Sequence, residues 1–188
     1  MCSIKVAKLA LLGRPGVGKD TFIKCFRELY PHFSSQLIRL SNPLYEVQNF
    51  IYKICSKEIE KDVQDGVLLN FLGNHMRTIN PNVLLQPFAQ AVKDIEAKKS
   101  MDVILCSDVR PIDAQFIKQL GFTIVNIVTD PAIAFERRKQ RGDLSLGDNS
   151  HVTEDGISAN MYNVQICNNG TIEDYKKIIN QVLKDFFQ

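Results

Sequence analysis

Residues 9–21 have the sequence Leu9-Ala-Leu-Leu-Gly13-Arg-Pro-Gly-Val-Gly18-Lys19-Asp20-Thr21, and they give the strongest structural signal in the chain. An apolar run leads into a glycine-rich turn, a lysine and a helical pattern, which is typical of a strand, a phosphate-binding loop and a helix. Glycines let successive backbone N–H groups converge on an anion, and the helix N-terminus and Lys19 add positive charge. The segment therefore predicts a binding site for a nucleoside triphosphate.

The loop departs at one position from the common pattern G-x-x-x-x-G-K-[ST], because Asp20 stands where Ser or Thr is expected, before Thr21. A carboxylate beside phosphates is repelled unless a cation lies between them, so we expect Asp20 to be linked to a metal or turned toward a basic partner. Lys19 is expected to reach the transferable phosphate, and Thr21, or less directly Asp20, to hold Mg²⁺ or its waters. ATP and Mg²⁺ are the expected cofactors, and the expected binding residues are Gly13, Arg14, Gly16, Val17, Gly18, Lys19, Asp20 and Thr21.

The composition is that of an ordinary globular chain. Its 188 residues suit a single domain, and the net charge of +2 gives no reason to expect a nucleic-acid or membrane surface. No apolar run reaches the roughly 18 residues of a membrane-spanning helix, and no signal-peptide layout precedes the loop. The five scattered cysteines form no C-x-x-C pair, so free thiols are expected rather than a metal site or disulfides. We therefore expect a cytoplasmic protein, either a monomer or a homodimer.

Apolar periodicity along the chain predicts strands that alternate with helices. The expected strands cover residues 5–12, 36–40, 101–106, 122–128 and 164–167. The expected helices cover residues 19–30, 43–55, 81–99, 113–120 and 130–141, and a last helix follows Thr171, with Asp174 placed for a capping box. Residues 56–80 show no clear pattern, and residues 141–163 are polar and predict a mobile loop. This alternation favours an α/β fold with a parallel sheet covered on both faces.

Asp108 and Arg110 closely follow the apolar run that ends at Cys106. Ligands of parallel sheets gather at the carboxyl ends of the strands, where these residues are expected to lie. Asp108 fits a ligand of Mg²⁺-bound water or a substrate contact, and the alternative is a helix N-cap or turn residue. Arg110 can bind a phosphate through two N–H groups, and the alternative is a salt bridge to Asp108 or Asp113.

A second group of arginines, Arg137, Arg138 and Arg141, lies at the end of an expected helix and before a glycine-containing polar segment. Positive charge near a helix C-terminus is favourable in itself. Arginines at the base of a closing lid would also stabilise charge on a transferred phosphoryl group, so we expect at least one of them to be catalytic. Arg77, and less strongly Arg39, are candidates for binding the phosphate of an acceptor.

Several short motifs occur along the chain in an order that is more specific than any of them alone. They are Gly18-Lys-Asp-Thr21, Leu40-Ser-Asn-Pro-Leu-Tyr-Glu46, Ser107-Asp-Val-Arg110, Glu136-Arg-Arg-Lys-Gln-Arg-Gly142 and Ile166-Cys-Asn-Asn-Gly-Thr171. In this combination the chain resembles the deoxynucleoside monophosphate kinases of the phage type, within the adenylate-kinase-like group of P-loop kinases. The resemblance spans nearly the whole chain.

The resemblance implies a single three-layer α/β P-loop NTPase domain over residues 1–188, with a five-stranded parallel sheet flanked by helices. It implies an acceptor-binding helical region at about residues 42–100 and a lid at about residues 137–163. Lys19, Arg137, Arg141 and Asp108 would be catalytic. Lys19 and the two arginines would hold the migrating phosphoryl group, while Asp108 and Arg110 would serve the acceptor and metal side. The implied activity is ATP-dependent phosphorylation of a small monophosphate acceptor, foremost a deoxynucleoside monophosphate.

The acceptor side departs from the family's pattern. The family tends to carry an Arg and a Gln where this chain has Gly66 and Asn70, and a Phe-Pro-Asn-Glu-like run where it has Pro111-Ile-Asp-Ala114. A kinase for another phosphorylated metabolite, such as dephospho-coenzyme A or phosphomevalonate, is therefore a second hypothesis. A nucleotide-binding switch without phosphotransfer is a third, although the sequence lacks an Asn-Lys-x-Asp guanine-reading motif.

Overall fold

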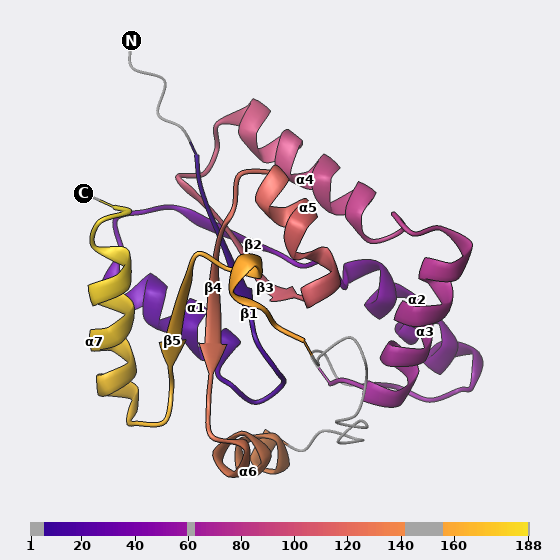
Figure 1. Ribbon diagram of the computed structural model, residues 1–188. Helices are drawn as coiled ribbons and strands as arrows, with labels where there is room; N and C mark the ends of the chain where they lie inside the picture. Colours follow the sequence, from indigo (N-terminus) through magenta and orange to yellow (C-terminus); the bar gives the residue numbers. More distant parts are fainter. Residues whose placement is uncertain (1–5, 60–62, 142–155, 188) are drawn as a thin grey trace.

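A computed structural model describes residues 6–59, 63–141 and 156–187, with Arg141 described by its backbone alone. Its centre is a five-stranded, wholly parallel sheet in the order β2-β3-β1-β4-β5 (Figure 1). The strands are β1 (Ala7–Leu12), β2 (Ser35–Ile38), β3 (Val103–Val109), β4 (Thr123–Val128) and β5 (Val164–Cys167). The predicted α/β fold with five parallel strands is therefore confirmed.

Helices cover both faces of the sheet. They are α1 (Lys19–Leu29), α2 (Asn42–Ile54), α3 (Gly66–Ile79), α4 (Leu85–Lys98), α5 (Ala114–Gln119), α6 (Pro131–Arg141) and α7 (Ile172–Leu183). Leu9 and Leu11 of β1 share a core with α1 and α7, whereas Ala10 and Leu12 share a core with α4 and α5. Successive residues of a strand point to opposite faces, so the central strand β1 contributes to both cores. The result is the expected three-layer arrangement, with α1 and α7 on one face and α4 and α5 on the other.

The predicted capping box at the start of α7 is present. The Thr171 hydroxyl accepts a hydrogen bond from the Asp174 N–H at 3.2 Å, and the Asp174 carboxylate accepts one from the Thr171 N–H at 3.2 Å. The box satisfies N–H groups that have no partner within the helix. It fixes the turn between β5 and α7, which lies beside the phosphate-binding loop described below.

Helix α3 lies within residues 56–80, where the sequence shows no clear period. The Asp65 carboxylate caps it by accepting a hydrogen bond from the Leu68 N–H at 3.1 Å. Of its residues only Leu69 and Gly73 are fully buried, and Leu69 shares a small core with Leu44 of α2 and with Leu84. Val67, Phe71 and Ile79 are exposed, so apolar residues stand on both sides of the helix and obscure its one buried face in the sequence. Helices α2 and α3 pack on each other at one side of the sheet (Figure 1).

Strand β3 is longer than expected. It was expected to end at Cys106, but it continues through Ser107 and Asp108 to Val109, which pairs with Leu12 of β1 after a shift in register. Asp108 is therefore a strand residue near the carboxyl end of β3. Helix α6 is present as expected, while most of the expected lid falls on residues 142–155, which lie outside the described residues.

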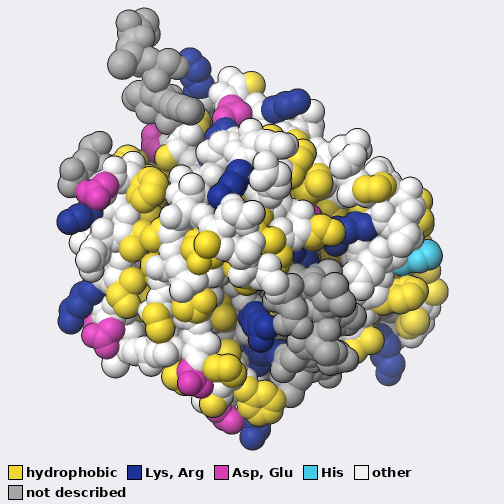
Figure 2. Space-filling model, in the orientation of Figure 1, with side chains coloured by type: hydrophobic (Ala, Val, Ile, Leu, Met, Phe, Trp, Pro, Cys, Tyr) yellow, Lys and Arg dark blue, Asp and Glu magenta, His cyan; other side chains and the backbone are white. Residues whose placement is uncertain are grey.

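Positive and negative side chains are interspersed over the face drawn in Figure 2, together with scattered apolar ones. Among the helices of the described segments, none is long and apolar enough to span a bilayer.

Candidate active site

The phosphate-binding loop joins β1 to α1 and depends on glycine at several positions. Gly13, Gly16 and Gly18 have φ values of 143°, 86° and 98°, which L side chains rarely adopt. A Cβ at Gly13 would meet the Ile127 carbonyl oxygen, and one at Gly16 would meet the Ala134 carbonyl oxygen. Glycine is therefore required both for the loop's conformation and for its close contact with β4 and α6.

Side chains distant in sequence support the loop from behind. The Asn168 amide donates a hydrogen bond to the Val17 carbonyl at 2.8 Å, and the Thr129 hydroxyl donates one to the same carbonyl at 3.3 Å. The Tyr175 hydroxyl donates to the Gly18 carbonyl at 3.3 Å. Burial raises the pKa of Tyr175, so its phenol stays protonated and remains a donor. Sequence reasoning missed these supporting residues, because their partners are known only once the chain is folded.

Lys19 begins α1 and turns back over the loop. Its ammonium group donates to the Gly13 carbonyl at 2.5 Å and to the Arg14 carbonyl at 3.0 Å. Gly18, the N-cap of α1, offers no side chain to cap the N–H groups of the first turn. The loop thus combines a helix N-terminus without a side-chain cap and a lysine ammonium group, which is an arrangement suited to phosphate.

One cavity of about 680 Å³ joins the loop to residues that follow β2 and to residues of β3, α2, α3 and α6. The structure brings most of the predicted site residues to it, namely Gly13, Gly16, Gly18, Lys19, Asp20, Thr21, Arg39, Arg77, Asp108, Arg110 and Arg137. Val17 is buried beneath the loop, and Arg14 is exposed with its carbonyl bound to Lys19. The side chain of Arg141 lies outside the described residues.

The cavity's apolar and amide side chains, which sequence reasoning did not single out, come mainly from the α2 and α3 region. They are Leu44, Tyr45, Gln64, Leu69 and Leu84. The turn that places Gln64 is held by Gln48 of α2, whose amide accepts a hydrogen bond from the Asp65 N–H at 3.0 Å and donates one to the Val63 carbonyl at 3.3 Å.

Arg77 and Asp113 form a buried pair at the edge of the cavity. Arg77 Nη2 lies 3.0 and 3.3 Å from the carboxylate oxygens of Asp113, and Arg77 Nη1 donates to the Gly73 carbonyl at 3.2 Å. Burial raises the pKa of Asp113, while the Arg77 guanidinium and, more weakly, that of Arg110 oppose this rise. The predicted phosphate ligand Arg77 is thus held by a carboxylate that lies 36 positions away in the sequence.

Two other arginines of the cavity have different partners. Arg110 Nη2 donates to the Asn70 side-chain oxygen at 3.1 Å, so a neutral amide orients its charge. Arg39 Nη2 lies 3.6 Å from an Asp20 carboxylate oxygen, which places Asp20 beside a basic partner. That pair is partly exposed, so its electrostatic attraction is screened by solvent.

The Asp108 carboxylate faces the turn between β2 and α2. Its Oδ1 accepts from the Leu40 N–H at 3.0 Å, and its Oδ2 accepts from the Ser41 N–H at 2.8 Å and from the Ser41 hydroxyl at 2.5 Å. Asp108 therefore links β3 to a turn that lies 67–68 positions away in the sequence.

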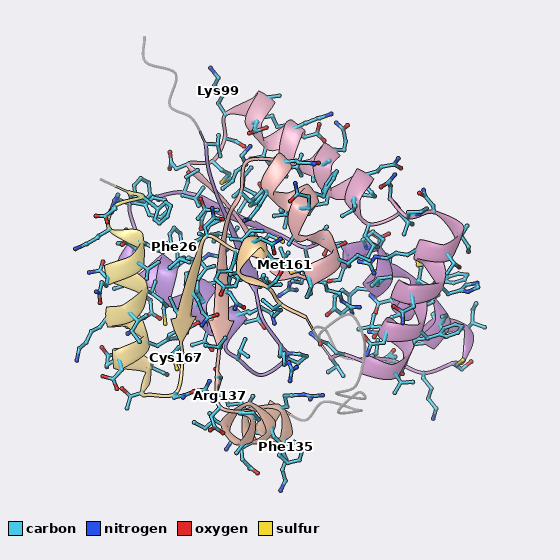
Figure 3. All side chains as sticks on the ribbon, in the orientation of Figure 1. Phe26, Lys99, Phe135, Arg137, Met161 and Cys167 are labelled. Atoms are coloured by element: carbon cyan, nitrogen blue, oxygen red, sulfur yellow. The ribbon has the colours of Figure 1, made fainter. Side chains whose placement is uncertain are left out.

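Helix α6 packs directly against the loop. Arg137 donates to the Asn168 carbonyl at 3.1 Å, and Figure 3 shows it on the side of α6 that faces the sheet, with Phe135 on the outer side. Arg138 is buried, lines the cavity, and has its side chain packed against Gly16. Both arginines therefore lie close to the glycine-rich loop.

Two side chains at the start of α1 offer oxygen atoms that suit Mg²⁺. The Asp20 carboxylate and the Thr21 hydroxyl both line the cavity in the first turn of α1. Mg²⁺ prefers oxygen ligands and commonly binds through one or two protein groups, with waters and substrate phosphates as the rest. Within the described residues no cluster of three or more His, Cys, Asp or Glu side chains could hold a metal by itself. Asp20 and Thr21 therefore fit a site in which Mg²⁺ would be bound jointly by protein oxygens, waters and substrate phosphates.

Comparison with known proteins identifies the fold. No protein-family model and no curated protein matches the sequence. Among solved structures, the protein TT1252 from Thermus thermophilus matches with a TM-score of 0.60 at 12% identity, over 97% of this chain and 98% of that one. The chain shares this fold with two solved kinases. APS kinase from Mycobacterium tuberculosis, in complex with AMPPNP and APS, matches with a TM-score of 0.58 at 9% identity, over 96% and 98% of the two chains. Shikimate kinase from Acinetobacter baumannii, in complex with shikimate, matches with a TM-score of 0.54 at 16% identity, over 97% and 96%.

Proposed function

We propose that this protein is a P-loop kinase, which transfers the γ-phosphoryl group of ATP to a small acceptor that already carries a phosphate. The foremost candidate acceptor is a nucleoside or deoxynucleoside monophosphate. The observation that supports this most directly is the shared cavity. It contains the glycine-rich loop and Lys19 together with the cationic side chains Arg39, Arg77 and Arg110. A donor site and a cationic acceptor site that open into one cavity are what direct phosphoryl transfer needs.

On the donor side, the loop N–H groups and Lys19 would bind the phosphates, so Lys19 would exchange its contacts with the Gly13 and Arg14 carbonyls for phosphate oxygens. Asp20 and Thr21 are the residues that would hold Mg²⁺, and that ion would neutralise charge on the donor phosphates when bound. Arg137 and Arg138 approach the same end from α6, where guanidinium groups would stabilise charge on the group in transfer. Arg141, at the last position of α6, remains a candidate for the same role.

On the acceptor side, we assign Arg110 to phosphate binding, because its guanidinium lines the cavity and its contact with Asn70 orients it. Arg39 lies across the cavity beside Asp20, between the donor and acceptor halves. Leu44, Tyr45 and Leu69 supply apolar surface for the remainder of the acceptor, and Gln64 and Asn70 supply amides that can bind its polar groups. This mixture suits a molecule with an apolar or aromatic body and polar edges.

Another phosphorylated metabolite, such as dephospho-coenzyme A or phosphomevalonate, is the second candidate acceptor. The observation that favours it is the use of Asp113 within the Pro111–Asp113 turn to hold Arg77, at a place where the resembled kinases carry a different motif. The fold itself is compatible with diverse acceptors, since it is shared with proteins bound to shikimate and to APS.

ADP release in a coupled assay, with ATP, Mg²⁺ and a panel of phosphorylated acceptors, tests the proposal. We expect at least one nucleoside monophosphate, or one of the alternative metabolites, to stimulate ADP release well above the rate with ATP alone. Stimulation by none of them would overturn phosphoryl transfer to a monophosphate and would favour a nucleotide-binding role without transfer.

The same assay tests Lys19. Lys19→Ala is expected to reduce acceptor-stimulated turnover at least about 10²-fold, because it removes a cation from the group in transfer. The melting temperature should change little, since its bonds to the loop carbonyls are partly exposed. Lys177→Ala, at an exposed lysine of α7, is the control and should retain full activity. Full activity in Lys19→Ala would exclude this loop as the donor site.

A further inference from the structure

We propose that Asp108 is a positioning residue, which acts through Ser41 to fix the start of α2 as one wall of the cavity and does not touch the reacting atoms. This inference rests on contacts that do not depend on the proposed function. Only the description of that wall as the acceptor side rests on the proposed function.

Most of the hydrogen bonds that the Asp108 carboxylate can accept are already donated by groups of the protein itself. A carboxylate offers about four positions to donors. The Leu40 N–H, the Ser41 N–H and the Ser41 hydroxyl occupy three of them, and the Cys106 thiol, a weak donor, lies 3.4 Å from Oδ1. Because these donors surround both oxygens, little capacity remains for a substrate hydroxyl or a metal-bound water.

These bonds fix the junction between β2 and α2. Ser41 is the N-cap residue of α2, yet its side chain does not cap the helix and donates to Asp108 instead. The Asp108 charge lies next to the helix N-terminus, where negative charge is favourable. Arg39 precedes this junction, and Leu44 and Tyr45 follow it in the first turns of α2, and all three line the cavity. A displacement of the junction would therefore move residues that contact an acceptor.

The opposite end of the same strands holds a matching contact. Asp102 precedes β3, and its carboxylate accepts hydrogen bonds from the Ser34 N–H at 2.8 Å and from the Ser34 hydroxyl at 2.6 Å. Ser34 precedes β2, just as Ser41 follows it. An aspartate and a serine thus tie β3 to β2 at each end, and the pair formed by Asp102 and Ser34 lies away from the cavity. The same bonding between residues that do not line the cavity indicates that it serves to hold the two strands.

Hydrogen–deuterium exchange on the intact protein tests the positioning role without any need for turnover. Asp108→Asn and Ser41→Ala are each expected to increase amide exchange in the first turns of α2 about tenfold and to leave α1 unchanged. Asp102→Asn is the matched control, since it removes an equivalent contact at the far end and should leave α2 unchanged. The inference would be overturned if α2 exchanged at the wild-type rate in Asp108→Asn, or if Asp102→Asn loosened α2 equally.

Steady-state kinetics with an acceptor that the wild type turns over separates positioning from chemistry. Both cavity-side variants should raise the KM for the acceptor about tenfold, with little change in the KM for ATP or in the Mg²⁺ concentration for half-maximal rate. The double variant should be no worse than Asp108→Asn alone, because both changes break one contact. A large loss of kcat with unchanged acceptor KM, or a changed Mg²⁺ requirement, would show instead that Asp108 touches the reacting groups or the metal.

The proposed function and the positioning role of Asp108 can be contradicted independently of each other. If no phosphorylated acceptor is turned over by the wild type, the proposed function is wrong, and the exchange measurement still decides whether Asp108 holds α2. If the wild type is active and the exchange of α2 is unchanged in Asp108→Asn, the proposed function stands and the positioning role is wrong.

Discussion

The cationic residues of the cavity differ in the groups that hold them. Arg77 lies against both oxygens of the buried Asp113 carboxylate, so its charge is largely balanced within the protein. Arg110 donates to the neutral amide of Asn70, and its charge also opposes the rise in the pKa of Asp113. Because the contact with Asn70 fixes the direction of the Arg110 guanidinium, Asn70 is expected to matter for acceptor binding even though it carries no charge itself.

Asn70→Asp tests this difference at one atom. The substitution keeps the shape of the side chain but places a carboxylate 3.1 Å from the Arg110 guanidinium, where it would compete with a phosphate. We expect the KM for a phosphorylated acceptor to rise by about tenfold or more, with the KM for ATP unchanged, as steady-state kinetics would measure. Asn74→Asp, in the same helix, is the control. An unchanged acceptor KM in Asn70→Asp would show that the acceptor does not bind at Arg110.

Gly18 gives a second prediction at the residue scale. A Cβ there would collide with the Asn168 amide and would need a φ of about 98°, whereas one at Gly156 would need a similar φ of 100° but would meet no atom within 4 Å. Gly156→Ala should therefore cost only about 1–2 kcal/mol from backbone strain. Gly18→Ala should cost about 1–3 kcal/mol more and also weaken ATP binding, because Asn168 must leave the Val17 carbonyl. Urea unfolding and ATP titration would measure both effects, and equal losses in the two variants would contradict the supporting role of Asn168.

At the scale of elements, the pair formed by Arg77 and Asp113 joins α3 to the short turn before α5. The two side chains are only 14% and 3% exposed, so each would be costly to bury without the other. Arg77→Leu is expected to destabilise the protein by about 3–5 kcal/mol at neutral pH, since it leaves a buried charge without its partner. Urea unfolding would measure this, and a loss below about 1 kcal/mol would contradict the pairing.

The loss of unfolding free energy in Arg77→Leu is expected to decrease as the pH falls. Burial raises the pKa of Asp113 and Arg77 lowers it, so removal of Arg77 raises the pKa further. A raised carboxyl pKa means that the folded state favours the protonated form, so the penalty is greatest where Asp113 is ionised and decreases as the pH falls through its folded pKa. The destabilisation in Arg77→Leu should therefore be smaller at about pH 5 than at pH 7. The double variant Arg77→Leu/Asp113→Asn should lose this dependence.

The elements that sequence predicted well are those with strong local signals. The loop, α1 and the capped α7 are set by glycines, periodic apolar residues and a capping box within a few residues of one another. Helix α3 was not predicted, because apolar residues also stand on its exposed side. The partners of the site residues could not be predicted from the sequence either. Asn168 donates to a carbonyl 151 positions away, and Asp108 accepts from Ser41, which lies 67 positions away. Such pairs depend on the order of strands in the sheet, which local patterns do not contain.

At the scale of the whole molecule, the strand order β2-β3-β1-β4-β5 explains why distant motifs meet. The carboxyl ends of parallel strands lie at one edge of the sheet, so the loop after β1, Arg39 after β2, Asp108 and Arg110 at β3 and α6 after β4 all reach the same cavity. The same edge meets α2 and α3 at its side, which supply the apolar wall. Under the proposed function, this architecture would bring the donor and acceptor sites together at one edge of the sheet.

Mass-spectrometric detection of the product is the most direct test of this account. The protein would be incubated with Mg²⁺, ATP labelled at the γ-phosphoryl group and a mixed pool of nucleoside monophosphates and other phosphorylated metabolites. The account predicts one labelled product, an acceptor that has gained the phosphoryl group, formed by the wild type and absent with Lys19→Ala. Label that appears only in inorganic phosphate, at equal rates in both proteins, would contradict it.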